Sequence, residues 1–333
     1  MIVSRCAKDS TSAVAGTSRQ TALIDSDLES LLQPFPGWQA EWIHLGPAPA
    51  SHHGVRVSFG SGTFTALHTS SAGILRGMAS GDSVALLTSP PAPARPRIFS
   101  NAIGGDRCLV LGPAANLDLY VPPGGSVMIM ALPVGSPGAG SAMADTGRAE
   151  YCELDKAQSE VLSRCTDSLE EIRTEPPSSQ TSRDAQRRLR DLLRPTSTMF
   201  RDAGPRPFPQ RARLQRHNAV IRACEFVDSH LRAPIALMDL CEAAGVSTRA
   251  LEYGFRDFYG LGPMAYVRNL RLCRVRHDLL DPAHADSVSS AARRWSFTHM
   301  GQFSHDYRAL FGEMPSKTLA AHQRAAKAND SLS

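Results

Sequence analysis

The 333-residue sequence lacks the features of membrane proteins, disulfide scaffolds and common hydrolases. Its longest apolar stretch, Val127 to Leu132, is too short to cross a bilayer. The seven cysteines are odd in number and form no C-x-x-C pair, so we interpret them as reduced thiols that fill apolar positions. No G-x-S-x-G, H-E-x-x-H or P-loop motif is present. We therefore expect a cytoplasmic protein that is not an enzyme and has no cofactor.

The composition along the chain predicts an α+β protein with two domains. Residues 1–30, rich in Ser, Thr and Ala, are predicted to be a mobile arm with a short helix near its end, and residues 31–194 have a β-rich texture. Residues 195–212 contain four prolines and are predicted to be a linker. Residues 213–325 have helical periodicity and a surplus of basic residues, and residues 326–333 are predicted to be a disordered tail.

Short β-type runs about ten residues apart, separated by Gly and Pro, predict a cupin-like antiparallel barrel or sandwich in the first domain. The runs are Trp38–Leu45, Val55–Phe59, Phe64–His68, Gly73–Met78, Ser83–Thr88, Cys108–Leu111, Leu117–Val121 and Val127–Leu132. Two predicted helices, Glu153–Arg173 and Ser182–Leu193, flank this β-rich part. They either form a homodimer face, which we favour, or only cover the sheet.

The β-rich domain offers two candidate sites. His52, His53 and His68 suggest a metal site, but no H-x-H motif with a downstream Glu accompanies them, so we expect no metal. Five aromatic residues either line a ligand cavity or fill the core, and filling is the simpler interpretation for each. They are Trp38, Trp42, Phe59, Phe64 and Tyr120.

The second domain contains an internal repeat of twelve positions. Leu237, Leu240, Cys241, Ala244, Gly245 and Val246 match Val288, Ala291, Ala292, Trp295, Ser296 and Phe297, which lie 51 residues later. After one inserted residue, Leu251, Phe255, Phe258, Tyr259, Gly260 and Pro263 match Phe303, Tyr307, Leu310, Phe311, Gly312 and Pro315, which lie 52 residues later. The pattern predicts two helix-turn-helix units joined by a helix over residues 264–280.

In each unit the second helix, residues 248–259 or 298–311, has one apolar face and one polar face. Gly245 is expected to form a left-handed turn, and Ser247 and Thr298 are expected to cap the two helices. Such helices can enter a DNA major groove with their polar face. The predicted contact residues are Thr248, Arg249, Glu252, Tyr253 and Arg256 in the first unit, and His299, Met300, Gly301, Ser304, His305 and Arg308 in the second.

The connecting helix is rich in arginine. Arg268, Arg274 and Arg276 either contact DNA phosphates or form a solvated face, and Arg271 is expected to brace the domain through Asp239 or Asp306. A helix of about seventeen residues spans roughly 25 Å. That separation lets the two second helices enter successive major grooves, which lie about 34 Å apart.

These residues resemble the DNA-binding domain of the AraC/XylS family of bacterial transcription regulators. The resemblance covers about residues 217–322 and rests on Gly245-Val246-Ser247, Arg271-Leu272 and the segment from Ser296 to Pro315. Ser296 departs from the Gly usual in the family, and we expect it to be tolerated because the turn needs a small residue. By position, the family's base-contacting sites fall on Arg249, Glu252 and Tyr253, and on Met300, Gly301, Ser304 and His305. The second set has fewer hydrogen-bonding groups.

The resemblance implies a transcription regulator of the activator type that binds double-stranded DNA through its C-terminal domain. It also implies an N-terminal domain that senses a small-molecule effector, forms a homodimer or does both, with RNA polymerase as a further partner. Two alternatives stay open at this point. One is a β-barrel enzyme acting on a small metabolite with an appended helical module, and the other is a DNA-binding repressor whose N-terminal domain only dimerises.

Overall fold

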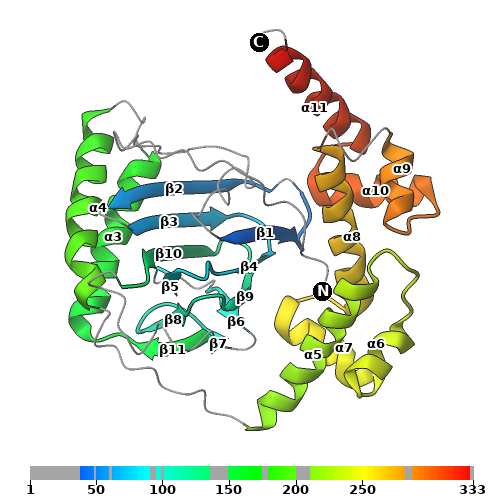
Figure 1. The fold of residues 1–333 in the computed structure, drawn as a ribbon, viewed down its shortest axis with the longest axis horizontal. Helices are drawn as coiled ribbons and strands as arrows, with labels where there is room; N and C mark the ends of the chain where they lie inside the picture. The colour runs from blue at the N-terminus through cyan, green and yellow to red at the C-terminus, as the bar shows by residue number, and fades with distance from the viewer. Residues whose placement is uncertain are drawn as a thin grey trace.

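The computed structural model places two domains side by side, a β-domain of residues 38–199 and a helical domain of residues 211–330 (Figure 1). It describes residues 38–330 except 49, 60–61, 91–94, 99–100, 136–148, 175–178, 200–210 and 282–286. The predicted mobile arm with its short helix, most of the predicted linker and the last three residues lie outside the described residues.

The β-domain contains two antiparallel sheets. Sheet A has the strand order β1 (Gln39–His44), β4 (Gly73–Met78), β9 (Asn116–Val121), β6 (Arg97–Ile98) and β7 (Asn101–Ala102). Sheet B has the order β11 (Ala149–Glu153), β8 (Arg107–Leu111), β5 (Ser83–Thr88), β10 (Ser126–Pro133), β3 (Gly62–Thr69) and β2 (His52–Phe59). The sheets remain two separate layers, so the architecture is the sandwich form of the predicted β-rich domain.

All eight predicted β-type runs are strands, and β6, β7 and β11 were not predicted. The predicted helix from Glu153 begins at Lys156 instead, because residues 149–153 pair with β8. Asp155 and Gln158 then exchange two hydrogen bonds of 2.8 Å between side chain and backbone amide, which satisfies the first turn of the helix. Helix α3 therefore spans Lys156–Thr174 and is followed by α4 (Gln180–Met199).

Sheet B is buried on both faces, which explains the uninterrupted apolar run in β10. Val127, Ile129 and Ala131 face sheet A, whereas Met128 and Met130 pack under α3 and α4. Of the aromatic residues whose burial is described, Trp38 and Trp42 fill the core between the sheets, Phe64 lies under the helices, and Tyr120 faces the helical domain. The prediction of core filling is thus confirmed for Trp38 and Trp42, whereas Phe64 and Tyr120 are buried outside the core between the sheets. The side chain of Phe59 lies outside the described residues.

The helical domain contains the two predicted helix-turn-helix units. Its helices are α5 (Arg211–His230), α6 (Leu237–Ala244), α7 (Thr248–Tyr259), α8 (Pro263–Leu279), α9 (Val288–Arg294), α10 (Met300–Phe311) and α11 (Pro315–Asp330). Helices α7 and α10 both have 12 residues and begin 52 positions apart, so the inserted residue of the repeat falls in the turn before α10. The repeat in the sequence is a repeat in the structure.

Three predicted boundaries are wrong. Helix α10 begins at Met300 and not at Thr298, since the inserted residue shifts the start of the helix. Helix α4 continues to Met199, so Pro195 lies within a helix and not in the linker. Helix α11 continues to Asp330, through most of the predicted tail, because its alanine-rich sequence favours helix.

Ser296 occupies the same backbone conformation as Gly245 in the equivalent turn. Their φ angles are +63° and +65°, a region that costs a residue with a Cβ atom about 1 kcal/mol. The Ser296 hydroxyl donates a hydrogen bond of 2.5 Å to the Arg232 carbonyl, which offsets this cost. A serine is therefore accommodated by a specific contact as well as by its small size.

The rings of Trp42, His44, His52 and Phe311 form a chain of edge-on contacts that joins both sheets to the end of α10. The centroids of His44 and His52 lie 5.5 Å apart. Burial, and to a smaller extent positive charge on nearby groups, lower the pKa of His44 to about 3 and the pKa of His52 to about 4. These groups are His52 and Arg276 for His44, and His53 and His68 for His52.

Acidification is expected to destabilise the fold through these rings. Because both pKa values are lowered from 6.5, the unfolded chain binds more protons, so stability is lost as pH falls from about 6.5 towards 4. Between pH 6.5 and 5, protonation of His52 in the unfolded chain should lower the free energy of unfolding by about 2 kcal/mol. Urea unfolding across this range measures it. The double variant H44Q/H52Q should show a flatter profile, and an unchanged profile would contradict this assignment.

Substitutions at Ser296 are expected to separate its strain from its hydrogen bond. S296A keeps the strain and loses the bond, so unfolding free energy should fall by about 1 kcal/mol. S296G loses both and should stay close to the wild type. The reciprocal control G245A should be destabilised by about 1 kcal/mol, because no neighbouring backbone blocks a Cβ there and the cost is conformational. Equal stability of S296A and S296G, measured by thermal and urea unfolding, is the contrary outcome.

Candidate nucleic-acid interface

The first candidate surface is the outward face of α7. Gly245 ends α6 in the left-handed conformation, and the Ser247 hydroxyl accepts a 3.4 Å hydrogen bond from the amide of Ala250. Both predicted roles are confirmed. Phe255 and Phe258 are buried on the opposite face of the helix, so burial of the aromatic side fixes which residues point outward.

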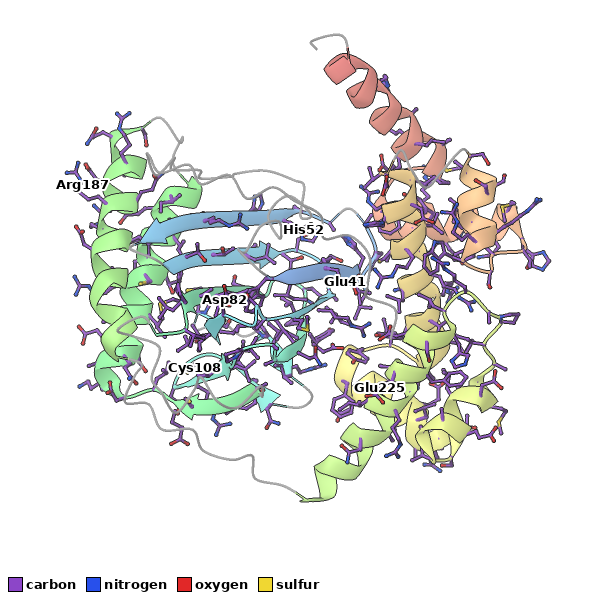
Figure 2. The ribbon with its side chains drawn as sticks, viewed as in Figure 1. Glu41, His52, Asp82, Cys108, Arg187 and Glu225 are labelled. Atoms are coloured by element: carbon purple, nitrogen blue, oxygen red, sulfur yellow. The ribbon has the colours of Figure 1, made fainter. Side chains whose placement is uncertain are left out.

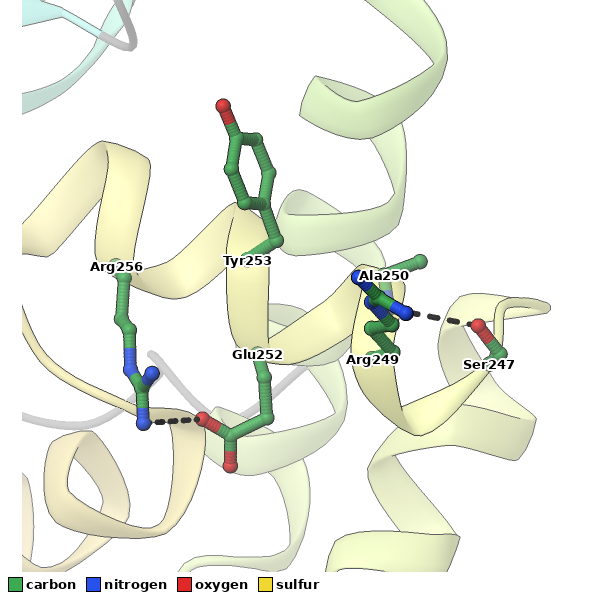
Figure 3. A pocket seen from close by; sticks show the side chains of 6 residues that line it. All are labelled: Ser247, Arg249, Ala250, Glu252, Tyr253 and Arg256. Atoms are coloured by element: carbon green, nitrogen blue, oxygen red, sulfur yellow. Dashed lines mark hydrogen bonds and ion pairs between the residues drawn. The ribbon is translucent and has the colours of Figure 1, made fainter.

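The outward face surrounds an open hollow of about 490 Å³ (Figure 3). It is lined by Ser247, Arg249, Ala250, Glu252, Tyr253 and Arg256. Four of these were predicted contact residues, and the structure brings them together. Arg249 is exposed, Tyr253 is 58% exposed and the Arg256 side chain is 71% exposed. The surface therefore presents two cations and one exposed tyrosine side chain.

Glu252 is turned away from this solvent-facing group. Its carboxylate lies 3.4 Å from the Arg256 guanidinium and packs against Gly262, where a Cβ would come within 3.0 Å of it. Gly262 is the residue before α8, and the partial positive charge of a helix N-terminus favours a carboxylate there. In this structure Glu252 positions Arg256, and its predicted contact with a cytosine amino group stays a prediction.

The second candidate surface, on α10, differs from the first at equivalent positions. Gly301 takes the place of Arg249, and Arg308 takes the place of Arg256. His299 precedes the helix without a side-chain cap bond, so the predicted cap at Thr298 is wrong. His299, Gly301, His305 and Arg308 are exposed, whereas Met300 and Ser304 are half-buried.

Gln302 is a candidate contact residue that the sequence analysis missed. It is exposed and lies 52 positions after Ala250, which lines the hollow of the first unit. Its amide nitrogen donates a 2.8 Å hydrogen bond to Asp306, which fixes the side chain along the helix. It was missed because its equivalent in the first unit is Ala250, which has no polar side chain and was not a predicted contact residue.

The arginines of α8 hold the structure together. Arg268 pairs with Asp306 at 3.4 Å, Arg276 with Glu313 at 2.8 Å, and Arg274 with Glu41. Each of these three side chains has a carboxylate partner, so they do not form a freely solvated face, and their contact with DNA phosphates stays a prediction.

Arg271 braces the domain as predicted, but through other partners. Its guanidinium donates to the carbonyls of Leu231 and Ala233, at 3.0 and 2.5 Å, and not to Asp239 or Asp306. The carbonyls that follow α5 lack helical partners and so offer acceptors at this place.

Metal-binding clusters and membrane-spanning helices are both absent from the described part of the chain. It contains no group of three or more His, Cys, Asp or Glu side chains that could hold a metal ion. Of the predicted histidines, His68 contacts the Ser126 hydroxyl at 2.9 Å, and His52 is buried among aromatic rings. No helix of the described residues combines the length and apolarity that a membrane span needs.

Residues 240–321 match the model of a family described as a helix-turn-helix domain. The chain is 35% identical over 99 residues to a probable thc operon regulatory protein of Rhodococcus erythropolis, covering 29% of this chain and 30% of that protein. It is 37% identical over 103 residues to the XylDLEGF operon transcriptional activator 2 of Pseudomonas putida, covering 31% of this chain and 66% of that protein. Both matches span less than two thirds of the relative's length.

Among solved structures, a probable AraC family transcriptional regulator from Rhodopseudomonas palustris is 34% identical. The match covers 32% of this chain and 97% of that chain, with a TM-score of 0.30. The family model covers residues 240–321, which hold most of both helix-turn-helix units. The helical domain of this chain therefore belongs to the DNA-binding domains of the AraC/XylS family of transcription regulators.

Proposed function

We propose that the protein is a sequence-specific transcription regulator that binds double-stranded DNA with α7 and α10 in successive major grooves. The observation that carries the proposal is the pair of 12-residue helices, each with a buried aromatic face and an outward polar face. The match of residues 240–321 to a helix-turn-helix family supports it. Neither helix has its outward face covered by the β-domain, since the residues near its N-terminal end are exposed.

Base recognition is assigned mainly to α7. Arg249 can donate two hydrogen bonds to a guanine, whereas its equivalent on α10 is Gly301, which has no side chain. Arg256 and Arg308 are equivalent cations one to two turns further along each helix, where they can meet phosphate oxygens. Both units are thus proposed to bind the DNA phosphate backbone, and the first unit to supply more of the preference for a particular base sequence.

The β-domain is proposed to sense a small-molecule effector, to form a homodimer, or to do both. Helices α3 and α4 lie on the side of the β-domain that faces away from the helical domain (Figure 1), so a second copy could bind them without touching α7 or α10. The protein is further proposed to act in the cytoplasm as an activator that contacts RNA polymerase. Thermal-shift measurements with candidate effectors separate sensing from pure dimerisation, since a domain that only dimerises gains no stability from a ligand.

Replacing Arg249 and Arg256 by alanine is expected to have different effects on DNA binding. R249A should relax the preference at one base position, with a loss of about 1–3 kcal/mol on the preferred sequence only. R256A should weaken binding to all sequences and reduce the dependence of log K on log salt by about one. Selection from a random duplex library, followed by binding measurements at several salt concentrations, gives both quantities for the full chain.

The equivalent variant R308A is the matched control for R256A, because it removes the same charge from the second unit. It should reduce the salt dependence by a similar amount and leave the preferred bases unchanged. Equal losses on preferred and random DNA for both R249A and R256A would falsify the assignment of α7 as the base-reading helix.

A further inference from the structure

A row of alternating charges crosses the face of sheet A that meets the helical domain. Glu41 on β1, Arg76 on β4 and Asp118 on β9 are direct neighbours in the strand register. One position further along each strand, Trp42, Leu75 and Leu119 point to the opposite side and lie in the core between the sheets. The same three strands therefore carry the inter-sheet core on one face and a charged row on the other.

Arg76 is the centre of this row. Its guanidinium contacts Asp118 at 3.2 Å within the sheet and Asp228 of α5 at 3.0 Å across the interface. It also donates a hydrogen bond to the Tyr266 hydroxyl of α8. The Arg76 side chain is only 16% exposed, so these partners replace most of its hydration.

The two carboxylates of the row also reach the helical domain. Glu41 accepts hydrogen bonds from both terminal nitrogens of Arg274 on α8, and Figure 2 shows Glu41 at the edge of the β-domain nearest that helix. Asp118 accepts a 3.5 Å hydrogen bond from the Tyr259 hydroxyl at the end of α7. Each charge of the row thus meets a partner that complements it on the helical domain.

The contacts fix the C-terminal ends of both DNA-binding helices. Tyr259 is the last residue of α7, and the Ala309 carbonyl near the end of α10 accepts a 2.9 Å hydrogen bond from the Ala48 amide. Ile43, Ile74 and Tyr120 lie on the same three strands as the charged row. They belong to the hydrophobic core of the helical domain. The β-domain therefore holds α7 and α10 at one end and leaves their outward residues accessible.

We propose that the row of Glu41, Arg76 and Asp118 is an interdomain latch, which holds the helical domain against sheet A and whose release lets that domain move as a separate body. Interfaces between domains that contain many charged groups open more readily than large apolar ones. A change in the packing of Trp42, Leu75 or Leu119 would shift the strands that carry the latch. The link between core packing and the latch rests on the proposed sensing function. The latch itself does not depend on that function.

The experiment compares the full-length wild type with R76M and R274E. Methionine keeps the volume of the arginine stem and removes all three polar contacts, and R274E places a carboxylate against Glu41. Small-angle scattering should give a radius of gyration a few ångström larger for both variants, against about 20 Å for a compact chain of this length. Calorimetry should resolve two unfolding transitions where the wild type shows one. Far-UV circular dichroism should match the wild type, because each domain stays folded.

Two further variants make the result specific. E41Q in the R274E background removes the like-charge repulsion and should restore the wild-type radius and single transition. D82K reverses an exposed charge in the turn between β4 and β5, away from the interface and from α3 and α4 (Figure 2), and should leave both readouts unchanged. The latch is overturned if R274E and R76M keep the wild-type radius, if E41Q fails to rescue R274E, or if D82K opens the chain equally. If no effector binds the wild type although the latch is present, that result counts against the proposed sensing function and not against the latch.

Discussion

The structure depends on the fact that sheet A has two faces that must be covered. Its inner face is buried against sheet B, but its outer face carries Ile43, Ile74 and Tyr120, which among the described residues pack into the core of the helical domain and not into the β-domain cores. The helical domain covers them, and its own core continues into the sheet. This single burial requirement places α8 along the sheet, directs the ends of α7 and α10 toward it, and leaves the outward faces of α7 and α10 exposed.

The two helix-turn-helix units show how a repeated scaffold can carry unequal surfaces. Both second helices bury aromatic residues at matching positions, such as Phe255 and Tyr307, and this sets the same outward direction in each. The outward residues are under no such constraint. Arginine faces solvent at position 249 and glycine at position 301, so the packing is symmetrical and the chemistry offered to a groove is not. The Ser296 turn shows that even the scaffold tolerates a difference where a local hydrogen bond offsets the strain.

Local patterns predicted most elements because the signals are local. Strands with apolar alternation and helices with caps are specified within a few residues, so β4, β5 and α7 have the predicted bounds. The weak strand β11 exists only because β8 offers it a partner, which no local pattern reveals. Side-chain partners were predicted less well. The Glu252–Arg256 pair is local, four residues apart on one helix, whereas Arg271 bonds carbonyls 38 and 40 residues away that only folding brings close.

Arg76 marks the limit of sequence reasoning most clearly. In an alternating strand it occupies a polar position, which predicts a solvent-facing side chain, yet its partner Asp228 lies 152 residues away in another domain. A guanidinium removed from water is stable only while its carboxylates stay in place, because losing one leaves an uncompensated charge. The same desolvation that makes the closed arrangement specific makes its opening cooperative, so the two domains should exchange between discrete arrangements without a continuum of partly open ones.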